Sequence, residues 1–134
     1  PVANYVPWVK TGNLVFVSGQ LPVVDGTATV AGILGASVSV EQAQAAARQA
    51  GINVITQMND ACGGDLDRVV RVVKLGGFVA ATADFTQYPQ VMNGASDLMV
   101  EVFGEAGRHA RTTVGVPSLP LNVCIEIDAI VEVR

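Results

Sequence analysis

The carboxyl-terminal stretch constrains the fold of this chain more than any other part of it. In residues 123–134, one set of alternate positions is entirely apolar: Val123, Ile125, Ile127, Ala129, Val131 and Val133. The positions between them hold Cys124, Glu126, Asp128, Ile130 and Glu132. Successive side chains of a β-strand point to opposite faces of a sheet, so this pattern predicts a strand with one fully apolar face. Such a strand is expected inside a sheet, not at an exposed edge.

Two carboxylates, Glu126 and Asp128, lie in the middle of this predicted strand. An uncompensated carboxylate near a core costs several kcal/mol, so both are expected to have a cation nearby. Arg111 is the nearest candidate in the sequence. It opens a second predicted strand, residues 111–116, and the two prolines and the asparagine that follow exclude a continuous ladder between the two strands.

Three further strands are predicted from short apolar or β-branched runs bounded by turn residues: residues 14–17, 27–30 and 69–81. The turn signal Asp25-Gly26 connects the first two as a hairpin. The glycine pair Gly76-Gly77 lies inside the third, where it indicates either a bulge or the close approach of a neighbour or ligand. Residues 1–10 carry no such pattern and are expected to form a loop.

Two amphipathic helices are also predicted. The first begins after Ser39, whose hydroxyl can cap it, and Gln42 occupies the position that a capping box requires. Its apolar face is formed by Ala43, Ala47, Ala50, Val54, Met58 and Ala61. The second begins at Asp84 or Thr86, with Pro89 tolerated in its first turn. Its apolar stripe is formed by Val91, Ala95, Leu98, Met99, Val102 and Phe103.

The predicted order is β-β-α-β-α-β-β, an α+β architecture in a single domain that spans residues 1–134. Two helices with one apolar face each can cover only one side of a sheet. The chain is 50% hydrophobic and only 15% charged, which also indicates that some apolar surface is buried against another subunit. The sequence therefore predicts an oligomer in which partner chains cover the other side of the sheet.

Charge and hydropathy exclude several classes of partner. The net charge is −4 and no basic run exists, which argues against binding of nucleic acid. The apolar runs are far shorter than the roughly 20 residues that span a bilayer. Without a recognisable signal peptide, a cytoplasmic location is expected. Because a native chain does not start with Pro1, further residues are expected to precede it.

The reactive side chains outside the strands point to no catalytic arrangement of their own. Cys62 lies in a glycine-rich turn and Cys124 in a strand, so both are expected to be reduced, small core residues and not a disulfide or a metal site. His109 is the single histidine and lies in a polar turn, where it is expected to be solvated. A Ser/His/Asp or Cys/His mechanism would have to use it, and nothing nearby in the sequence supports one.

Five stretches, in this order, together resemble the signature of the RidA (YjgF) family of enamine/imine deaminases: residues 18–22, 72–74, 110–114, 118–120 and 125–130. The closing pattern, Ala-Arg followed by Leu-Pro and Ile-Glu-Ile-Asp-Ala-Ile, is the most specific part. The resemblance implies a homotrimer with a chorismate-mutase-like fold, in which the sheets meet around a threefold axis and the sites lie between subunits. Such an assembly would explain the sheet face that the helices leave uncovered.

The resemblance also implies roles for individual residues. Arg111 matches the arginine that binds the substrate carboxylate through two parallel hydrogen bonds, which lysine would not reproduce. Glu126 matches the carboxylate that orients and activates water. Thr113 stands where many members have a cysteine, so only its backbone contact with the ligand is implied. The residues that match the surroundings of the site are Tyr5, Ser18 and Gly19.

The implied reaction is hydrolysis of 2-aminoacrylate-type enamines, or their imine tautomers, to a 2-keto acid and ammonia. It requires no metal or organic cofactor, because an imine carbon is already electrophilic. Two alternatives remain: a non-catalytic regulatory protein that binds small carboxylates through Arg111, and a ribonuclease or translation inhibitor, which the acidic charge disfavours. Only Glu126 favours catalysis over binding. Residues 93–97 are small and polar where bulkier side chains are expected, which predicts a divergent branch with its own substrate.

Overall fold

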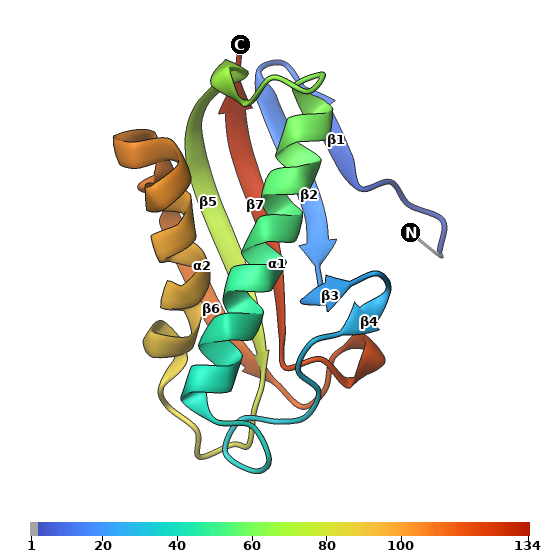
Figure 1. Cartoon of the computed structure of the whole chain (residues 1–134), viewed down its shortest axis with the longest axis vertical. Helices are drawn as coiled ribbons and strands as arrows, with labels where there is room; N and C mark the ends of the chain where they lie inside the picture. The colour runs from blue at the N-terminus through green and yellow to red at the C-terminus, as the bar shows by residue number, and fades with distance from the viewer. Residues whose placement is uncertain (1–2) are drawn as a thin grey trace.

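The computed structural model of the protein describes residues 3–134, so that Pro1 lies outside the described part. It contains one five-stranded sheet, a two-stranded ribbon and two long helices (Figure 1). The strands are β1 Trp8–Thr11, β2 Leu14–Gln20, β3 Val23–Val24, β4 Thr27–Ala28, β5 Val69–Ala80, β6 Ala110–Val116 and β7 Ile125–Val133. The helices are α1 Val40–Ala61 and α2 Tyr88–Phe103, and short 3-10 turns cover Leu66–Arg68, Gly104–Gly107 and Pro120–Asn122.

Strand β7 lies at the centre of the five-stranded sheet, as its alternation predicts. The order is β1-β2-β7-β5-β6, and β7 is antiparallel to both of its neighbours. Its odd-numbered residues, from Ile125 to Val133, are buried, and its even-numbered residues are only half-buried. Strand β6 pairs with β5 in parallel, so the predicted absence of a ladder between β6 and β7 is confirmed. The α+β fold of the chorismate-mutase-like type is therefore confirmed.

Helix α1 follows its sequence pattern closely. The Ser39 Oγ accepts a hydrogen bond from the Gln42 backbone N–H at 3.1 Å, and the Gln42 Oε1 accepts one from the Ser39 N–H at 2.9 Å. These reciprocal bonds satisfy two donors that would otherwise lack partners at the helix start. The helix continues through Gly51 without a break, and its small alanine face lets it pack closely across β2 and β7.

The start of helix α2 was predicted too early. The helix begins at Tyr88, and its N-cap residue Gln87 makes no side-chain capping bond. The Asp84 carboxylate, which could have capped an earlier start, instead accepts a hydrogen bond from the Thr82 hydroxyl at 2.6 Å. The Asp84 carboxylate thus stabilises the loop that precedes the helix, and Pro89 lies in the first turn of the helix, where its missing N–H is tolerated.

The amino-terminal part contains more strand than its sequence predicts. Residues 8–10, expected as loop, belong to β1, which pairs with β2 at the edge of the sheet. This strand has only four residues, three of them exposed, so it shows no alternation of buried and exposed positions. The predicted turn at Asp25-Gly26 is confirmed, but it joins β3 and β4 into a separate ribbon and not into the main sheet.

The glycine pair in β5 allows close approach and does not mark a bulge. The register shifts of β5 lie earlier in the strand, before Lys74. A side chain at Gly76 would collide with the Asp128 carboxylate on one face of the sheet, and a side chain at Gly77 with the Met92 sulfur on the other. Of the two alternatives, close contact with neighbouring groups is therefore the correct one.

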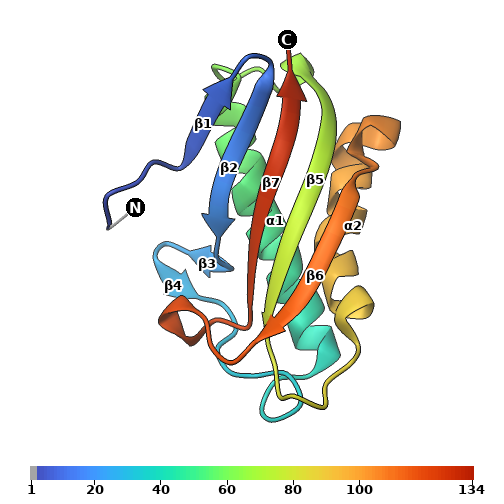
Figure 2. The same cartoon turned by 180° about the vertical axis from the view of Figure 1, so that it is seen from behind.

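Both helices lie on one face of the sheet, and the opposite face is uncovered in the single chain (Figure 2). Large apolar side chains are exposed on that face: 42% of Phe16 and 44% of Val114 remain accessible. The segment that precedes β1 projects away from the sheet (Figure 1). No helix within residues 3–134 has the length and hydropathy to span a membrane. The bare sheet face is the feature from which the oligomer was predicted.

Candidate functional site

Arg111 lies on the helix-covered side of the sheet. In the parallel ladder, Arg111 pairs with Leu75 and Thr113 with Gly77. Paired residues of adjacent strands point to the same face, and Leu75 is fully buried beneath the helices. Arg111 and Thr113 therefore point toward α2, and the alternate residues Thr112 and Val114 belong to the uncovered face.

Helix α2 holds one nitrogen of the Arg111 guanidinium. The Nη1 group donates hydrogen bonds to the Asn93 Oδ1 at 2.8 Å and to the Ser96 Oγ at 3.1 Å. Asn93 and Ser96 are three residues apart and so lie on one face of the helix. No other hydrogen bond or ion pair of the Arg111 side chain is found within residues 3–134. The Nε and Nη2 groups, which form one edge of the guanidinium, therefore keep their N–H groups for a ligand.

A cavity of about 260 Å³ lies beside this arginine, and its lining residues are Ser96, Asp97, Val100, Arg108, His109 and Arg111. Arg108 and Arg111 bring two positive charges to this lining and Asp97 brings one negative charge, so the net positive charge favours an anionic group. Asn93 and Ser96 belong to the small, polar stretch of α2 that the sequence singles out. Small residues in this stretch leave room next to the Arg111 guanidinium, as expected where they stand in place of bulkier side chains.

Thr113 also lies on this side of the sheet, and its Oγ1 is buried without a hydrogen-bond partner in the described chain. A buried hydroxyl without a partner is unfavourable, by about 1–3 kcal/mol. Strand β6 is the edge of the sheet, so part of its backbone hydrogen-bonding capacity is directed away from β5. The Thr113 hydroxyl is thus a polar group for which the described chain supplies no partner.

The predicted ion pair between Arg111 and the carboxylates of β7 is wrong within one chain. Glu126 pairs with Phe78 and Asp128 with Gly76, on the uncovered face of the sheet. Arg111 lies on the opposite face, two strands away, because β5 separates β6 from β7. The cation that acts on Asp128 is Lys74, which lies on the same face.

Glu126 belongs to a second group of predicted residues, where β7 lies beside the end of β2. Its carboxylate lies directly over Gly19, where any side chain would collide with Oε2. Ser18, next to Gly19, donates from its hydroxyl to the Val6 carbonyl at 2.7 Å, which ties the amino-terminal segment to β2. Tyr5, on that segment, lines a cavity of about 190 Å³ together with Ser18 and Gly19.

The environment of the two β7 carboxylates favours their protonated forms. Burial raises the pKa of Glu126 above its ordinary value, and the nearby charge of Asp128 raises that pKa further. Burial also raises the pKa of Asp128, although the Gly76 backbone and the Lys74 ammonium act in the opposite direction. In the single chain, Glu126 is therefore a stronger base than a solvated glutamate.

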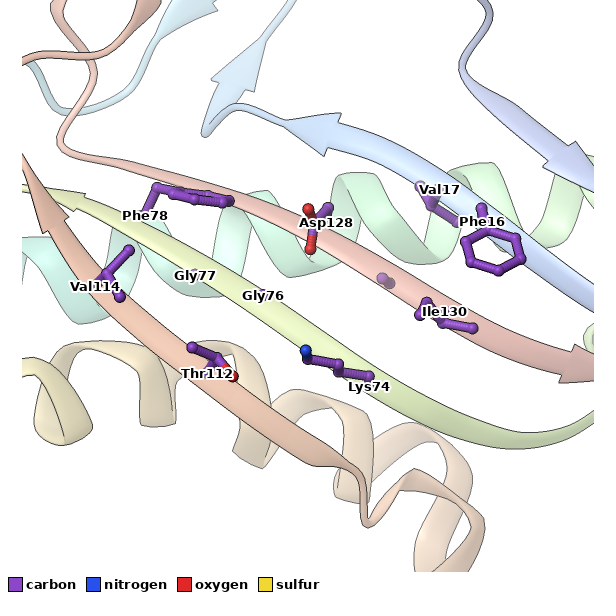
Figure 3. A pocket seen from close by; sticks show the side chains of 11 residues that line it. Phe16, Val17, Lys74, Gly76, Gly77, Phe78, Thr112, Val114, Asp128 and Ile130 are labelled. Carbon is purple, nitrogen blue, oxygen red and sulfur yellow. The ribbon is translucent and has the colours of Figure 1, made fainter.

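A hollow of about 330 Å³ on the uncovered face is formed by strands β2, β7, β5 and β6 (Figure 3). The aromatic rings of Phe16 and Phe78 lie at its two ends, with Asp128 between them (Figure 3). Lys74 extends into it from β5. Its walls are otherwise mostly apolar, which is typical of a surface that is covered in an assembly.

The sequence analysis misjudged one residue near Arg111. His109 was expected to be solvated, but it is half-buried, and its two ring nitrogens lie 2.8 Å from the Ser96 Oγ and 2.6 Å from the Gly107 carbonyl oxygen. The cysteines conform to expectation: both are buried and free, and burial raises the pKa of Cys124 to about 11. A thiol with so high a pKa is a poor nucleophile at neutral pH.

Comparisons with known proteins match this chain over almost its full length. The family described as "YjgF/chorismate mutase-like, putative endoribonuclease" matches residues 1–133. Protein TCP17 of Trypanosoma cruzi is 52% identical, covering 100% of this chain and 84% of that protein. A 2-iminobutanoate/2-iminopropanoate deaminase of Dermatophagoides farinae is 28% identical, covering 100% of this chain and 89% of the relative.

Among solved structures, Atu1372 of Agrobacterium tumefaciens, described as a protein of unknown function, has the same fold. The two share 50% identity with a TM-score of 0.96, over 98% of this chain and 83% of Atu1372. The signature stretches, the sheet order and these similarities agree with one another. The chain therefore belongs to the YjgF/chorismate mutase-like family.

Proposed function

We propose that this protein is a deaminase that hydrolyses 2-aminoacrylate-type enamines, or their imine tautomers, to 2-keto acids and ammonia. The observation that carries the proposal is the state of Arg111: α2 holds its Nη1, and its Nε and Nη2 have no partner in the described chain. Such an edge binds a carboxylate through two parallel hydrogen bonds, with fixed orientation as well as affinity. The name of the mite relative, a 2-iminobutanoate/2-iminopropanoate deaminase, supports this substrate class.

Glu126 supplies the second function, activation of water. Its carboxylate is partly desolvated and lies beside the cavity lined by Tyr5, Ser18 and Gly19. A base with a raised pKa takes a proton from water more readily and can then donate that proton to a leaving amine. The two halves of the site are on opposite faces of one chain, so a complete site requires Arg111 of one copy and Glu126 of another. A homotrimer that buries the uncovered sheet face would bring them together.

The reaction then needs only these groups. The substrate carboxylate binds the free edge of Arg111, and water held by Glu126 attacks the imine carbon, forming the new C–O bond. Glu126 accepts a proton from this water and passes it to the nitrogen, which gives a tetrahedral carbinolamine. The proton of the carbinolamine hydroxyl then passes through Glu126 to the nitrogen while the C–N bond breaks. The electron pair of that bond leaves with ammonia. The products are one 2-keto acid and one ammonia for each water consumed.

Ammonia release tests this proposal directly. A 2-aminoacrylate-type enamine, generated freshly in the assay, is expected to release ammonia faster with the protein than without it. Heat-denatured protein provides the control for non-specific catalysis by side chains. If hydrolysis is not accelerated although the protein binds a 2-keto acid such as pyruvate, the protein is a carboxylate-binding regulator and the deaminase proposal is wrong.

The assembly is tested by mass. Light scattering at micromolar concentration is expected to give about 42 kDa, three times the 13.9 kDa of one chain. Val114→Asp is expected to lower this mass, because the new charge would be buried in the interface beside Asp128 and Phe78. Ile52, which is 40% exposed on α1 in the helical layer, provides a matched control, and Ile52→Asp should leave the mass unchanged. A monomer mass for the unaltered protein would remove the intersubunit site.

A further inference from the structure

A chain of hydrogen bonds connects Arg111 on β6 with helix α2 and with the turn that follows this helix. The Arg111 Nη1 lies 3.1 Å from the Ser96 Oγ, which lies 2.8 Å from the His109 Nε2. The His109 Nδ1 lies 2.6 Å from the Gly107 carbonyl oxygen, which ends the chain. All three side chains also line the same cavity.

The chemistry of the two ends determines the direction of two of the three bonds in this chain. A carbonyl oxygen can only accept, so the His109 Nδ1 carries the proton that it donates to Gly107. A guanidinium can only donate, so the Ser96 Oγ accepts from Arg111. The bond between Ser96 and His109 has two possible directions. A neutral imidazole with its proton on Nδ1 accepts the Ser96 proton at Nε2, whereas a protonated Nε2 donates to the second lone pair of the Ser96 Oγ.

We propose that His109 is a positioning residue for the carboxylate anchor. By accepting the Ser96 proton, it keeps the Ser96 lone pairs directed to Arg111, which holds Nη1 on the α2 side. Together with Asn93, this occupies both protons of Nη1 and leaves the Nε and Nη2 edge as the one that binds an anion. This inference rests on the proposed role of Arg111 as the anchor of a substrate carboxylate. It assigns the specificity for planar carboxylates to Ser96 and His109, which are not among the site residues that the family resemblance implies.

The orientation matters because a guanidinium that rotates freely loses entropy when a ligand fixes it. A side chain that is already fixed in its binding geometry avoids this loss, which is the general advantage of a preorganised site. Removing a single neutral hydrogen bond of this kind is expected to weaken binding by about 3- to 10-fold. The effect should be much smaller than the loss of Arg111 itself.

The experiment is a double-mutant cycle on pyruvate affinity, measured by calorimetry on the intact protein. His109→Ala is expected to weaken pyruvate binding about 3- to 10-fold, and to change it less than about 2-fold when Ser96→Ala is already present. His109→Gln should recover part of the affinity, because its amide oxygen can accept the Ser96 proton. Independent, additive effects of His109→Ala and Ser96→Ala, or an unchanged affinity in His109→Ala, would overturn the proposal.

Arg108→Ala is the matched control, since Arg108 lines the same cavity but bonds to Glu105 at 3.1 Å and not to Ser96. The effect of Arg108→Ala on pyruvate affinity should be the same with and without Ser96→Ala. It should become smaller as salt is added. Thermal unfolding and mass measurements on each variant exclude a general loss of structure.

A second readout does not depend on the reaction or on any ligand. Nitrogen NMR of the unliganded protein at neutral pH is expected to show the neutral imidazole of His109 with its proton on Nδ1, and Ser96→Ala should shift the Nε2 resonance. A proton on Nε2 instead would contradict the network even if the protein is a deaminase. Conversely, a coupled cycle and this tautomer without any ammonia release would leave the role of His109 intact and refute the proposed activity.

Discussion

Replacing Arg111 with alanine is expected to weaken the binding of pyruvate by about 30-fold or more, equivalent to about 2 kcal/mol or more. The variant removes both the positive charge and the paired donors from a partly desolvated site. It also leaves Asn93 and Ser96 without their shared partner. Calorimetric titration of pyruvate into both proteins provides the measurement. Equal affinities would show that Arg111 is not the carboxylate anchor.

Arg111→Lys is expected to restore little of this affinity, because an ammonium group presents a single point of charge where the guanidinium presents two parallel donors. Arg48 offers a matched control for the loss of an arginine. It forms an exposed ion pair with Glu101 at 3.1 Å on the outer helices. Since exposed pairs contribute about 0–1 kcal/mol, Arg48→Ala should leave pyruvate affinity unchanged and stability nearly so.

Replacing Glu126 with glutamine is expected to lower the rate of imine hydrolysis by about 10²–10⁴, the usual contribution of a positioned acid or base. Glutamine keeps the shape of the side chain and its contact with Gly19, but it cannot accept the proton from water. The variant should still fold, assemble and bind pyruvate, so affinity is measured on the same sample as the rate. Hydrolysis at the unaltered rate would assign Glu126 a purely structural role.

Glu132 provides the control on the same strand. It is half-buried on the same face as Glu126, but it accepts a hydrogen bond from Asn13 at 3.3 Å near the far end of β7. Glu132→Gln should therefore retain the full rate. Mixed assemblies of Arg111→Ala and Glu126→Gln chains should recover part of the activity. In such a mixture, some interfaces combine an intact Arg111 of one copy with an intact Glu126 of another, which a site within one chain would not allow.

The pattern of residues predicted individual elements well where the signal is local. The alternation in residues 125–133 identified the strand and its buried face, and the fully apolar character of that face indicated its interior position in the sheet. The capping box at Ser39 and Gln42 located the start of α1 to the residue. The start of α2 was less accurate, because Asp84 is a suitable cap by type but is bonded to Thr82 instead.

The candidate site could be predicted only in part. Resemblance pointed to Arg111, Glu126 and the residues around Gly19, and the structure places Glu126 over Gly19 as one group. The resemblance singled out residues 93–97, which include Ser96, but neither alternation nor resemblance pointed to the bond between Ser96 and His109 beside Arg111. They are 13 residues apart, and the bond between them exists only because the turn after α2 leads directly into β6.

The sequence by itself determined which residues share a face of each strand and helix, that two helices can cover only one side of the sheet, and the family of the chain. Only the tertiary structure decided that Arg111 and Glu126 lie on opposite faces, that Lys74 is the cation near Asp128, and that His109 is bonded to Ser96. The physical reason is that alternation is a local property of an extended backbone. Which strands become neighbours, and in which register, depends on contacts between segments far apart in the chain, and these contacts decide which side chains meet.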